Sequence, residues 1–393
     1  MKLRRFAMLS SILVSFSHAP AFGATLVVDN DFLDCPQADT NSIQAAVVAA
    51  FPGDKILVCP GVYLETVLVN KPDLRIEAQG APGEVVLQGT PAQDFGFRLL
   101  NTTGVLLQGF TVQGFRTANI RIDGGSGNTL RKNITTLLVG FGSISNQGAS
   151  IQVFNSSANV VEQNTSFANC ETCNGISVTG AGSTDNIVRD NETFQNGQAG
   201  LQASSSGPRN VLRRNRSHNN AIGIRNILGS HGNVIENNYV FANAPTPLGP
   251  VSGGIIVGTS TNVTVSNNRS ERNVPFGIRL QNGSANNLVE KNEVFQNAQD
   301  GIRLEPTVAA GSLPVTANIV QLNHIQRNGR DGIRVFSSLA HDNTIERNVI
   351  RQSGEHDAHD DSVGAGTGGT ANLWMENKCE TENRPELCKN PDH

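Results

Sequence analysis

A pair of asparagines five residues apart returns along most of this chain, and this spacing constrains the fold more than any other feature. The pairs are Asn128 and Asn133, Asn159 and Asn164, Asn186 and Asn191, Asn210 and Asn215, Asn233 and Asn238, Asn287 and Asn292, Asn318 and Asn323, Asn343 and Asn348, and Asn372 and Asn377. Asn262 and Asn268 form a further pair that is one residue longer. The second asparagine of each pair follows the previous one by 23 to 31 residues. Because a period of this length indicates stacked structural repeats, the sequence predicts a solenoid.

Each repeat also carries short apolar segments with the alternation of β-strands. An apolar residue stands three positions before the second asparagine in every copy, at Leu130, Val161, Val188, Leu212, Ile235, Val265, Val289, Val320, Ile345 and Trp374. Segments of the type Gly-Ile-x-apolar follow at 175–178, 200–203, 223–226, 277–280, 301–304 and 332–335. Apolar residues two positions apart share one face of a strand, and no repeat sustains helical spacing with helix caps. The repeats are therefore expected to be all-β.

A coil of short strands fits this repeat length, because loops of variable length absorb the differences between copies. We predict an all-β, single-stranded parallel β-helix of about twelve coils, in which each strand pairs with its counterpart one coil away. Asparagine suits the corners because it tolerates left-handed backbone geometry and bonds local backbone groups. Stacked amides are expected to hydrogen-bond along the axis. Four phenylalanines and a histidine that share one position should stack in the same way: Phe167, Phe194, His218, Phe241 and Phe295.

The N-terminal segment supports the same architecture. Residues 42–50 have the pattern of a short amphipathic helix, and residues 52–63 contain the first strand patterns. Together with the repeats, this segment resembles the right-handed parallel β-helix repeat proteins of the pectate-lyase-like superfamily, in particular the NosD-like group. The resemblance implies a right-handed coil whose open N-terminal end is capped by the helix. A cap is physically required, since an open end would expose apolar side chains and unpaired strand edges.

The first residues have the features of a secretory signal. Lys2, Arg4 and Arg5 form a basic start, and residues 6–16 form an apolar core too short to anchor the chain in a membrane. We expect cleavage between Gly23 and Ala24, and therefore a secreted or periplasmic protein without a membrane span. The expected organisation is a signal peptide at 1–23, an N-terminal cap with the first strands at 24–70, β-helix repeats at 71–378 and a disulfide-closed tail at 379–393.

Six cysteines follow the signal segment, and an even number in an exported chain indicates disulfides. The expected pairs are Cys35 with Cys59, Cys170 with Cys173, and Cys379 with Cys388, of which the first and third would close the two ends of the coil. Cys170 and Cys173 have redox-motif spacing, but no thioredoxin-like βαβ pattern surrounds them. We therefore interpret this pair as a loop disulfide, and a single pair offers too few ligands for a zinc site.

The charge of the exported chain narrows the possible partners. After residue 23 the chain has 27 Lys and Arg against 34 Asp and Glu, a formal charge of −7. Nucleic-acid binders are normally basic, so we expect no nucleic-acid partner. The expected partner is a polysaccharide or a cell-surface glycan, and the chain is expected to be a monomer.

The first candidate site is a row of arginines at the variable position of the Gly-Ile-x segment. Arg225, Arg279, Arg303 and Arg334 occupy this position, and the last three follow one another in successive coils. On an exposed sheet face these four side chains could bind the carboxylates of a uronate polymer through guanidinium forks. In a lyase or C5-epimerase, one of Arg279, Arg303 and Arg334 would neutralise the sugar carboxylate while a base removes the neighbouring C5 proton. The alternative is a solvated face on which the arginines pair with Asp300, Glu305 or Asp331.

The second candidate is the acidic and histidine segment at 355–361. Asp357 and His359 could take part in acid–base chemistry, and with Asp360 and Asp361 they form a weak candidate metal site. Residues 357–360 show a faint resemblance to the Asp-Pro-His motif of mannuronan C5-epimerases, although the proline is absent and no tyrosine is near. The alternative is a polar loop between the last coil and the C-terminal cap.

Two functional hypotheses follow from these patterns. The first is a polysaccharide-interacting protein that uses the long sheet face, with possible lyase or epimerase activity. The second is a non-catalytic structural or surface-interaction protein, because a regular solenoid without a convergent acid–base set suits that class. No cofactor is expected, apart from a calcium ion if the protein is a lyase.

Overall fold

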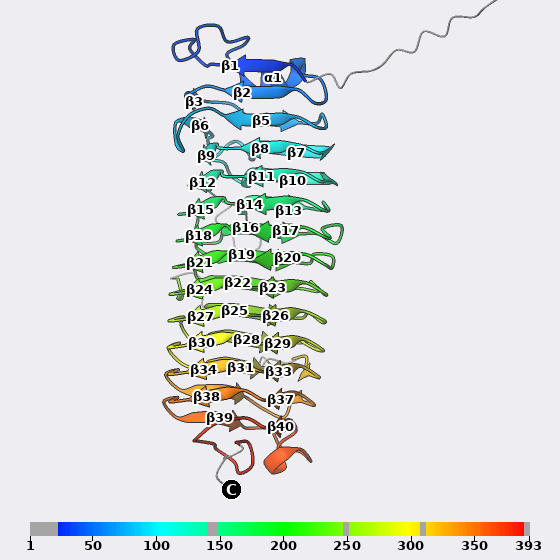
Figure 1. The fold of residues 1–393 in the computed structure, drawn as a ribbon, viewed down its shortest axis with the longest axis vertical. Helices are drawn as coiled ribbons and strands as arrows, with labels where there is room; N and C mark the ends of the chain where they lie inside the picture. Colours follow the sequence, from blue (N-terminus) through cyan, green and yellow to red (C-terminus); the bar gives the residue numbers. More distant parts are fainter. Residues whose placement is uncertain (1–22, 140–147, 247–250, 307–311, 389–393) are drawn as a thin grey trace, which may run out of the picture.

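The computed structural model describes residues 23–139, 148–246, 251–306 and 312–388. The strands stack into one long solenoid, with the first strand and the C-terminal end at opposite ends of its axis (Figure 1). Three long parallel sheets, here named sheets A, B and C, run along this axis. Twelve coils contribute one strand to each sheet, and sheet A has one further strand at each end. Sheets B and C contain twelve strands each, so the predicted number of coils is confirmed. The signal segment at 1–22 and residues 389–393 lie outside the described residues.

Sheet A has fourteen strands. In sheet order they are β1 (Thr25–Val28), β2 (Lys55–Val58), β5 (Arg75–Ala78), β8 (Leu106–Gln108), β11 (Thr129–Arg131), β14 (Val160–Glu162), β17 (Ile187–Arg189), β20 (Val211–Arg213), β23 (Val234–Glu236), β26 (Thr264–Ser266), β29 (Leu288–Glu290), β33 (Ile319–Gln321), β37 (Thr344–Glu346) and β40 (Leu373–Met375). The apolar residue of each asparagine repeat lies at the centre of these strands and is buried, as at Leu130, Val161 and Trp374. Inward and outward side chains alternate along these strands with the two-residue period of half-buried β-strands.

Sheet B follows sheet A along each coil. Its strands are β3 (Gly61–Tyr63), β6 (Val85–Gln88), β9 (Thr111–Gln113), β12 (Ile134–Thr136), β15 (Thr165–Phe167), β18 (Glu192–Phe194), β21 (Arg216–His218), β24 (Tyr239–Phe241), β27 (Arg269–Glu271), β30 (Glu293–Phe295), β34 (His324–Gln326) and β38 (Val349–Arg351). The rings of Phe167, Phe194, His218 and Phe241 stack on its outer face at centroid distances of 4.6 to 5.3 Å. The prediction that Phe295 joins them is wrong, because Glu271 occupies the register position between Phe241 and Phe295.

Sheet C completes each coil and carries the Gly-Ile-x segments. Its strands are β4 (Val67–Val69), β7 (Phe95–Thr103), β10 (Ala118–Ser126), β13 (Ala149–Phe154), β16 (Asn174–Thr179), β19 (Ala199–Ser204), β22 (Ile222–Ile227), β25 (Gly253–Gly258), β28 (Ile278–Gln281), β31 (Ile302–Glu305), β35 (Asp331–Val335) and β39 (His356–Asp360). A separate two-stranded sheet pairs β32 (Val315–Thr316) with β36 (Ala340–His341), and a 3-10 turn, η1, spans Thr367–Gly369.

One asparagine ladder connects successive coils at the corner between sheets A and B. Asn133, Asn164, Asn191, Asn215, Asn238, Asn268, Asn292, Asn323, Asn348 and Asn377 form one uninterrupted ladder in which each amide donates to the next Oδ1 at 2.9 to 3.1 Å. The ladder asparagines do not adopt the left-handed conformation that we expected of them. The residue before each one does, as Gln163 and Arg214 show with φ of 57° and 52°. The corner therefore needs the asparagine for its amide and not for its backbone freedom.

The first asparagine of each pair forms a second ladder, and this one has a break. Asn159 bonds to Asn186 and Asn186 to Asn210, each through an amide at 2.9 Å. Asn262 was expected to be a member, but it is exposed and the ladder position falls on Val263. The extra residue between Asn262 and Asn268 is the reason, since it moves Asn262 out of register. The N–H of Val263 still donates to Oδ1 of Asn287, so the backbone bond is kept without the amide.

Both ends of the solenoid are closed. At the N-terminal end, α1 (Ile43–Ala49) begins at Ser42, whose hydroxyl accepts from the N–H of Ala45, and it buries Ile43 and Val47. The disulfides Cys35–Cys59, Cys170–Cys173 and Cys379–Cys388 are present as predicted, and the first and third lie in the two terminal regions. At the C-terminal end the indole of Trp374 closes the core and donates to Oδ2 of Asp360 at 2.8 Å. No helix among the described residues is long and apolar enough to cross a membrane.

Candidate functional site

The variable residue of the Gly-Ile-x segment forms one row along the outer face of sheet C, which we name the outward row. The strand register places these residues side by side in the order Leu68, Arg98, Arg121, Gln152, Ser177, Gln202, Arg225, Ile256, Arg279, Arg303, Arg334 and His359. The middle of the row is buried, since Ser177 and Ile256 are 1% and 0% exposed. The row is therefore not the continuous exposed face that the sequence suggested, and its functional groups concentrate towards its ends.

At the C-terminal end of the row, arginines and carboxylates form a charged cluster. It comprises Arg279, Asp300, Arg303, Glu305, Arg330, Asp331, Arg334, His356, His359 and Asp361. Arg279 lies 3.0 Å from Glu305, and Arg303 contacts both Glu305 and Asp300. The arginine partners that we expected, Asp300, Glu305 and Asp331, are thus confirmed. The local sum of the arginines and carboxylates is close to zero, so the cluster does not form a basic patch.

Two aromatic rings hold the guanidinium groups in place. Arg303 and Arg334 lie over the ring of Phe336 at 4.7 and 4.3 Å from its centroid. Arg279 and Arg303 lie 5.4 and 5.3 Å from the ring centroid of Phe276. Cation–π contacts of this kind add to the ion pairs and fix the planes of the guanidinium groups. The three arginine side chains are consequently only 8 to 15% exposed, which is far less than a solvated sheet face would give.

The last two members of the row, Arg334 on β35 and His359 on β39, lie side by side between two carboxylates. His359 Nδ1 is 3.1 Å from Asp331 Oδ1, and its Nε2 is 3.0 Å from Asp361 Oδ1. Arg334 bonds the same two groups, with 3.1 Å to Asp331 Oδ2 and 3.1 Å to Asp361 Oδ2. An imidazole and a guanidinium are therefore presented together on one face, each oriented by the same pair of carboxylates.

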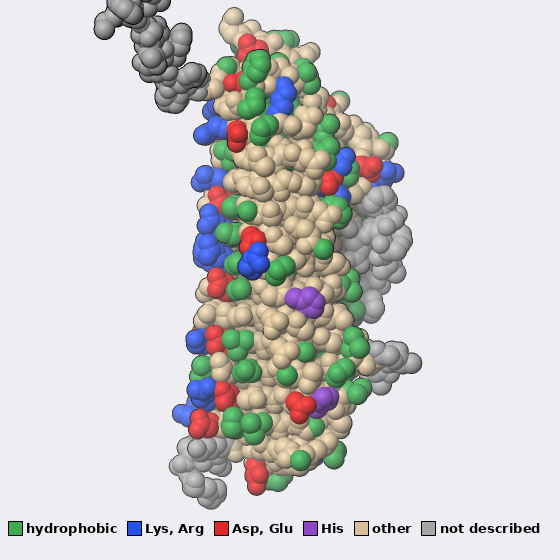
Figure 2. All heavy atoms as spheres, turned by 90° about the vertical axis from the view of Figure 1, so that its right-hand side faces the viewer, with side chains coloured by type: hydrophobic (Ala, Val, Ile, Leu, Met, Phe, Trp, Pro, Cys, Tyr) green, Lys and Arg blue, Asp and Glu red, His purple; other side chains and the backbone are tan. Residues whose placement is uncertain are grey.

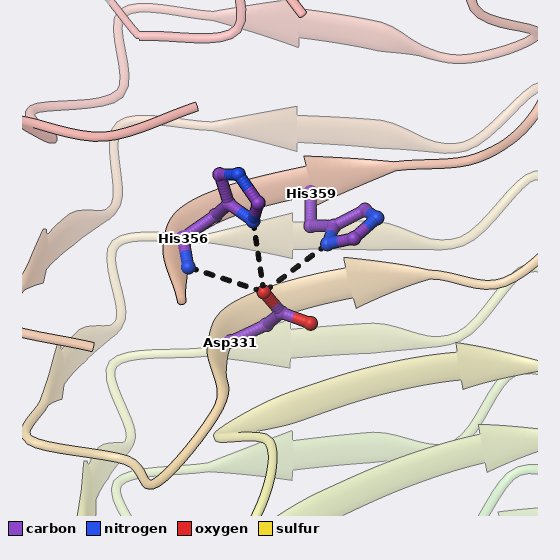
Figure 3. Close-up of side chains that lie close together, drawn as sticks. All are labelled: Asp331, His356 and His359. Atoms are coloured by element: carbon purple, nitrogen blue, oxygen red, sulfur yellow. Dashed lines mark hydrogen bonds and ion pairs between the residues drawn. The ribbon is translucent and has the colours of Figure 1, made fainter. Parts of the chain in front are cut away.

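A second histidine approaches Asp331 from the start of β39. His356 Nδ1 is 3.5 Å from Asp331 Oδ1, and the His356 N–H donates to the same oxygen at 3.3 Å. Figure 3 shows the side chains of Asp331, His356 and His359 meeting at this one carboxylate oxygen. Asp331 is fully buried, whereas the His356 side chain is 34% exposed.

The contacts of Asp331 and His359 shift both of their pKa values. Burial opposes both charged forms, but it is outweighed in each case by the partner groups. Hydrogen bonds and charges from His359 and Arg334 hold the pKa of Asp331 below its ordinary value. Asp331 and Asp361 in turn raise the pKa of His359 above that of a free histidine.

The remaining candidates of the 355–361 segment do not face the cluster. Asp357 points to the inside, where it accepts from the N–H groups of Ser353 and Glu380 at 3.1 and 3.0 Å. Asp360 is also buried and accepts from Trp374 and Ser362. The interpretation of this segment as a loop is wrong, because it forms β39, the last strand of sheet C. The strand alternation explains why His359 faces outward while Asp360 faces the core.

Arg225 lies on the same row but apart from the charged cluster. Ile256 separates it from Arg279, and its guanidinium donates to the side-chain oxygens of Gln202 and Gln198 at 2.9 and 2.6 Å. Burial lowers the pKa of Arg225 to about 10. Its position and its neutral partners distinguish it from Arg279, Arg303 and Arg334.

No functional role was predicted from the sequence for Asp331, His356 or Arg330. A repeated signal in the sequence points to Asp331 and His356. Asp-Gly-Ile-Arg occurs at 300–303 and 331–334, and His-Asp-Ala-His follows in the same frame at 356–359. Aligning the three segments places Asp331 next to His356 and Arg334 next to His359, as the strand register does.

The coil of three parallel sheets, with polar corners and a charged outer row, defines a parallel β-helix protein. The family model described as "Right handed beta helix region" matches residues 95–270 and 251–379. The chain belongs to this family, and its coil is right-handed. No curated protein sequence matches the chain.

Solved structures with the same fold include several polysaccharide-acting enzymes. The A-module of the mannuronan C-5 epimerase AlgE6 from Azotobacter vinelandii has a TM-score of 0.65 and 16% sequence identity, covering 86% of this chain and 94% of that one. The catalytic unit of a GH87 α-1,3-glucanase from Streptomyces thermodiastaticus has a TM-score of 0.67 and 14% identity, covering 93% and 70%. At these identities the similarity establishes the shared fold alone.

Proposed function

We propose that this protein is exported and binds a polysaccharide at the C-terminal end of the outward row. The observation that carries the proposal is the pairing of Arg334 with His359 between Asp331 and Asp361 on one face of sheet C. Oriented donors beside aromatic rings are what a sugar-binding surface requires, because they bond hydroxyls and carboxylates without reorganising. The mannuronan epimerase and the glucanase with the same fold, as well as the three disulfides, support this proposal.

The finer version of the proposal is a lyase or C5-epimerase acting on a uronate polymer. Arg334 would pair with the sugar carboxylate, and the base would remove the C5 proton. In a lyase the C4–O bond then breaks, C4 becomes doubly bonded to C5 and the leaving oxygen takes up a proton, whereas in an epimerase a proton returns to C5 from the other face. Of the two acid–base candidates in segment 355–361, only His359 faces the row, so it is the residue that we assign to proton transfer.

A calcium ion does not fit the histidine end of the cluster. Calcium prefers six to eight oxygen ligands, whereas two of the three groups that converge at Asp331 are imidazoles. The proposed sugar chemistry at Arg334 and His359 therefore includes no step through calcium.

Affinity electrophoresis through gels containing alginate, polygalacturonate or a neutral glucan tests the binding. We expect retardation by at least one polymer, and loss of it in Arg334→Gln but not in Arg131→Gln, a control on sheet A. Equal retardation of both variants would contradict the assigned site, and no retardation by any polymer would contradict the proposal.

A chemical assay of the same polymers decides whether the protein is an enzyme. Ultraviolet absorbance of an unsaturated product reports a lyase, and proton NMR of the recovered polymer reports epimerisation. We expect either signal to disappear in His359→Gln.

The rival function is a non-catalytic structural or surface-interaction protein. It is favoured by one observation, since the guanidinium groups of Arg279, Arg303 and Arg334 are each already paired with a carboxylate. Binding without turnover would support this rival, provided that Arg334→Gln leaves the binding unchanged.

A further inference from the structure

The two carboxylate oxygens of Asp331 contact different kinds of side chain. Oδ2 faces the guanidinium groups of Arg334 and Arg330 at 3.1 and 3.5 Å. Oδ1 faces two imidazole nitrogens, Nδ1 of His359 at 3.1 Å and Nδ1 of His356 at 3.5 Å. The arginines therefore fix the orientation of the carboxylate and leave Oδ1 directed towards the two histidines, as Figure 3 shows.

One of these nitrogens has no hydrogen bond. His356 Nδ1 is buried and makes none with any described residue, although it lies close to Asp331 Oδ1. A buried nitrogen that faces a carboxylate oxygen without bonding it is a costly arrangement for an imidazole. A ligand held between the two atoms would give this nitrogen a partner.

We propose that Asp331 Oδ1, His356 Nδ1 and His359 Nδ1 bind one divalent transition-metal ion such as Zn²⁺. One potential ligand atom from each of the three residues lies within 4.8 Å of those of the other two. In a tetrahedral zinc site with bonds of about 2.0 to 2.1 Å, ligand atoms lie about 3.3 Å apart, so the observed 3.1 and 3.5 Å need little adjustment. Two imidazoles and one carboxylate suit zinc and its neighbours, and three protein ligands leave one position open.

The groups behind the ligands match a metal site as well. A metal-bound histidine usually donates its other ring N–H to a carboxylate, and His359 Nε2 lies 3.0 Å from Asp361 Oδ1. The ligating carboxylate is itself bonded, through Oδ2, to Arg334 and Arg330. Each of these arginines has a second carboxylate partner, Asp361 or Asp300, so their positive charge at the site is largely offset.

The metal site is independent of the sugar proposal, because metal binding is measured without any sugar. The two proposals share His359, whose Nδ1 is a ligand in the metal-loaded chain. A failure of metal binding would leave the polymer assays unchanged, so the two outcomes are distinguishable.

Titration of untagged, chelator-treated protein with ZnCl₂ in a calorimeter tests the proposal. We expect one ion per chain, and at least 10-fold weaker binding in both His356→Ala and His359→Ala. His341→Ala, which removes a histidine outside the cluster, is the matched control and should bind like the parent. Absence of saturable binding, or equal affinity in the parent and both cluster variants, would overturn the proposal.

Two further measurements separate a lost ligand from a damaged fold. Asp361→Asn keeps all three ligands and changes only the carboxylate behind His359 and Arg334, and we expect about 10- to 100-fold weaker binding. Replacing Zn²⁺ by Co²⁺ should give the visible absorption bands of a tetrahedral ion with nitrogen ligands, and His356→Ala should change them. Bands that are identical in the parent and in His356→Ala would overturn the assignment of this ligand.

Discussion

The asparagine ladder and the charged cluster are built in the same way, yet they differ in what they repeat. Both are columns of side chains that parallel strands set side by side along the axis. The ladder repeats one residue type over ten coils, from Asn133 to Asn377. The cluster keeps arginine for only three coils, at Arg279, Arg303 and Arg334, and then changes to His359, as the neighbouring row changes from Asp331 to His356.

The bonding explains this difference. An amide both donates and accepts, so an asparagine satisfies a neighbour identical to itself, as Asn191 does by accepting from Asn164 Nδ2 at 3.0 Å and donating to Asn215 Oδ1 at 3.0 Å. A guanidinium only donates and a carboxylate only accepts, so charged columns must alternate or pair with the neighbouring column. A uniform column therefore marks the framework of a solenoid, and a mixed column marks a place where the sequence was free to build a site.

The mixture of signs extends beyond the cluster. The Lys and Arg side chains on one face of the solenoid gather along one edge, with Asp and Glu among them (Figure 2). Elsewhere in the described residues, Arg209 pairs with Asp185 and Arg214 with Asp190, each one coil apart. These exposed pairs contribute little to stability, since both partners are solvated. The charged cluster differs from them by its burial, and this difference can be measured.

The largest effect is expected at the centre of the cluster. Asp331→Ala should lower the free energy of unfolding by about 3 kcal/mol, because it removes the shared partner of Arg334 and Arg330 from a buried position. Asp361→Asn is the matched variant at a 39% exposed carboxylate, and it should cost less than about 1 kcal/mol. Urea denaturation followed by circular dichroism gives both values. Equal losses of unfolding free energy would show that the charged cluster is no better shielded from solvent than the surface pairs.

The fold could be derived from the sequence because its signals are local and repeated. The 23- to 31-residue period fixed the coil length, and the alternation around Leu130 or Val161 fixed the inward faces. The corners were placed correctly for a partly wrong reason, since Gln163 and not Asn164 adopts the left-handed conformation. That distinction depends on how the chain turns between two sheets, which residue type alone does not reveal.

The candidate site was harder to predict from the sequence than the fold. The arginine row was predicted from the repeat frame, whereas no strand was predicted for the 355–361 segment, which lacks the Gly-Ile pattern. Ala358 takes the inward position of Ile333, so the strand continues without its usual residue. The burial of Arg303 could not be foreseen either, because it depends on Phe276 and Phe336, which lie outside the repeat positions.

An intermediate effect is expected in the ladder. Asn215→Ala should lower the free energy of unfolding by about 2 kcal/mol, because the backbone N–H and the side-chain amide of Asn191 both lose their shared acceptor in the interior. Asn70→Ala, at an exposed asparagine outside the ladders, should change it by less than about 0.5 kcal/mol. The same urea titration measures both, and a cost for Asn215→Ala no greater than that for Asn70→Ala would remove the structural role assigned to the ladder.

The smallest effect concerns Glu271, where the column of stacked rings on sheet B changes to a charge. Burial favours the neutral carboxyl, but bonds from Tyr239, Arg269 and Arg272 hold the pKa of Glu271 below its ordinary value. A lowered pKa in the folded chain stabilises it above the pKa of the unfolded chain, and the stabilisation disappears as the pH falls through the folded value. The stability difference between the parent and Glu271→Gln should therefore be largest above about pH 5, below about 1 kcal/mol in size, and should shrink towards about pH 3. Glu293→Gln, at an exposed carboxylate of the next strand, is the control for the removal of a negative charge from sheet B. A stability difference between the parent and Glu271→Gln that stays constant over this pH range would mean that the bonds of Glu271 do not favour its ionised carboxylate. Glu271 would then interrupt the column of rings by its shape and not by its charge.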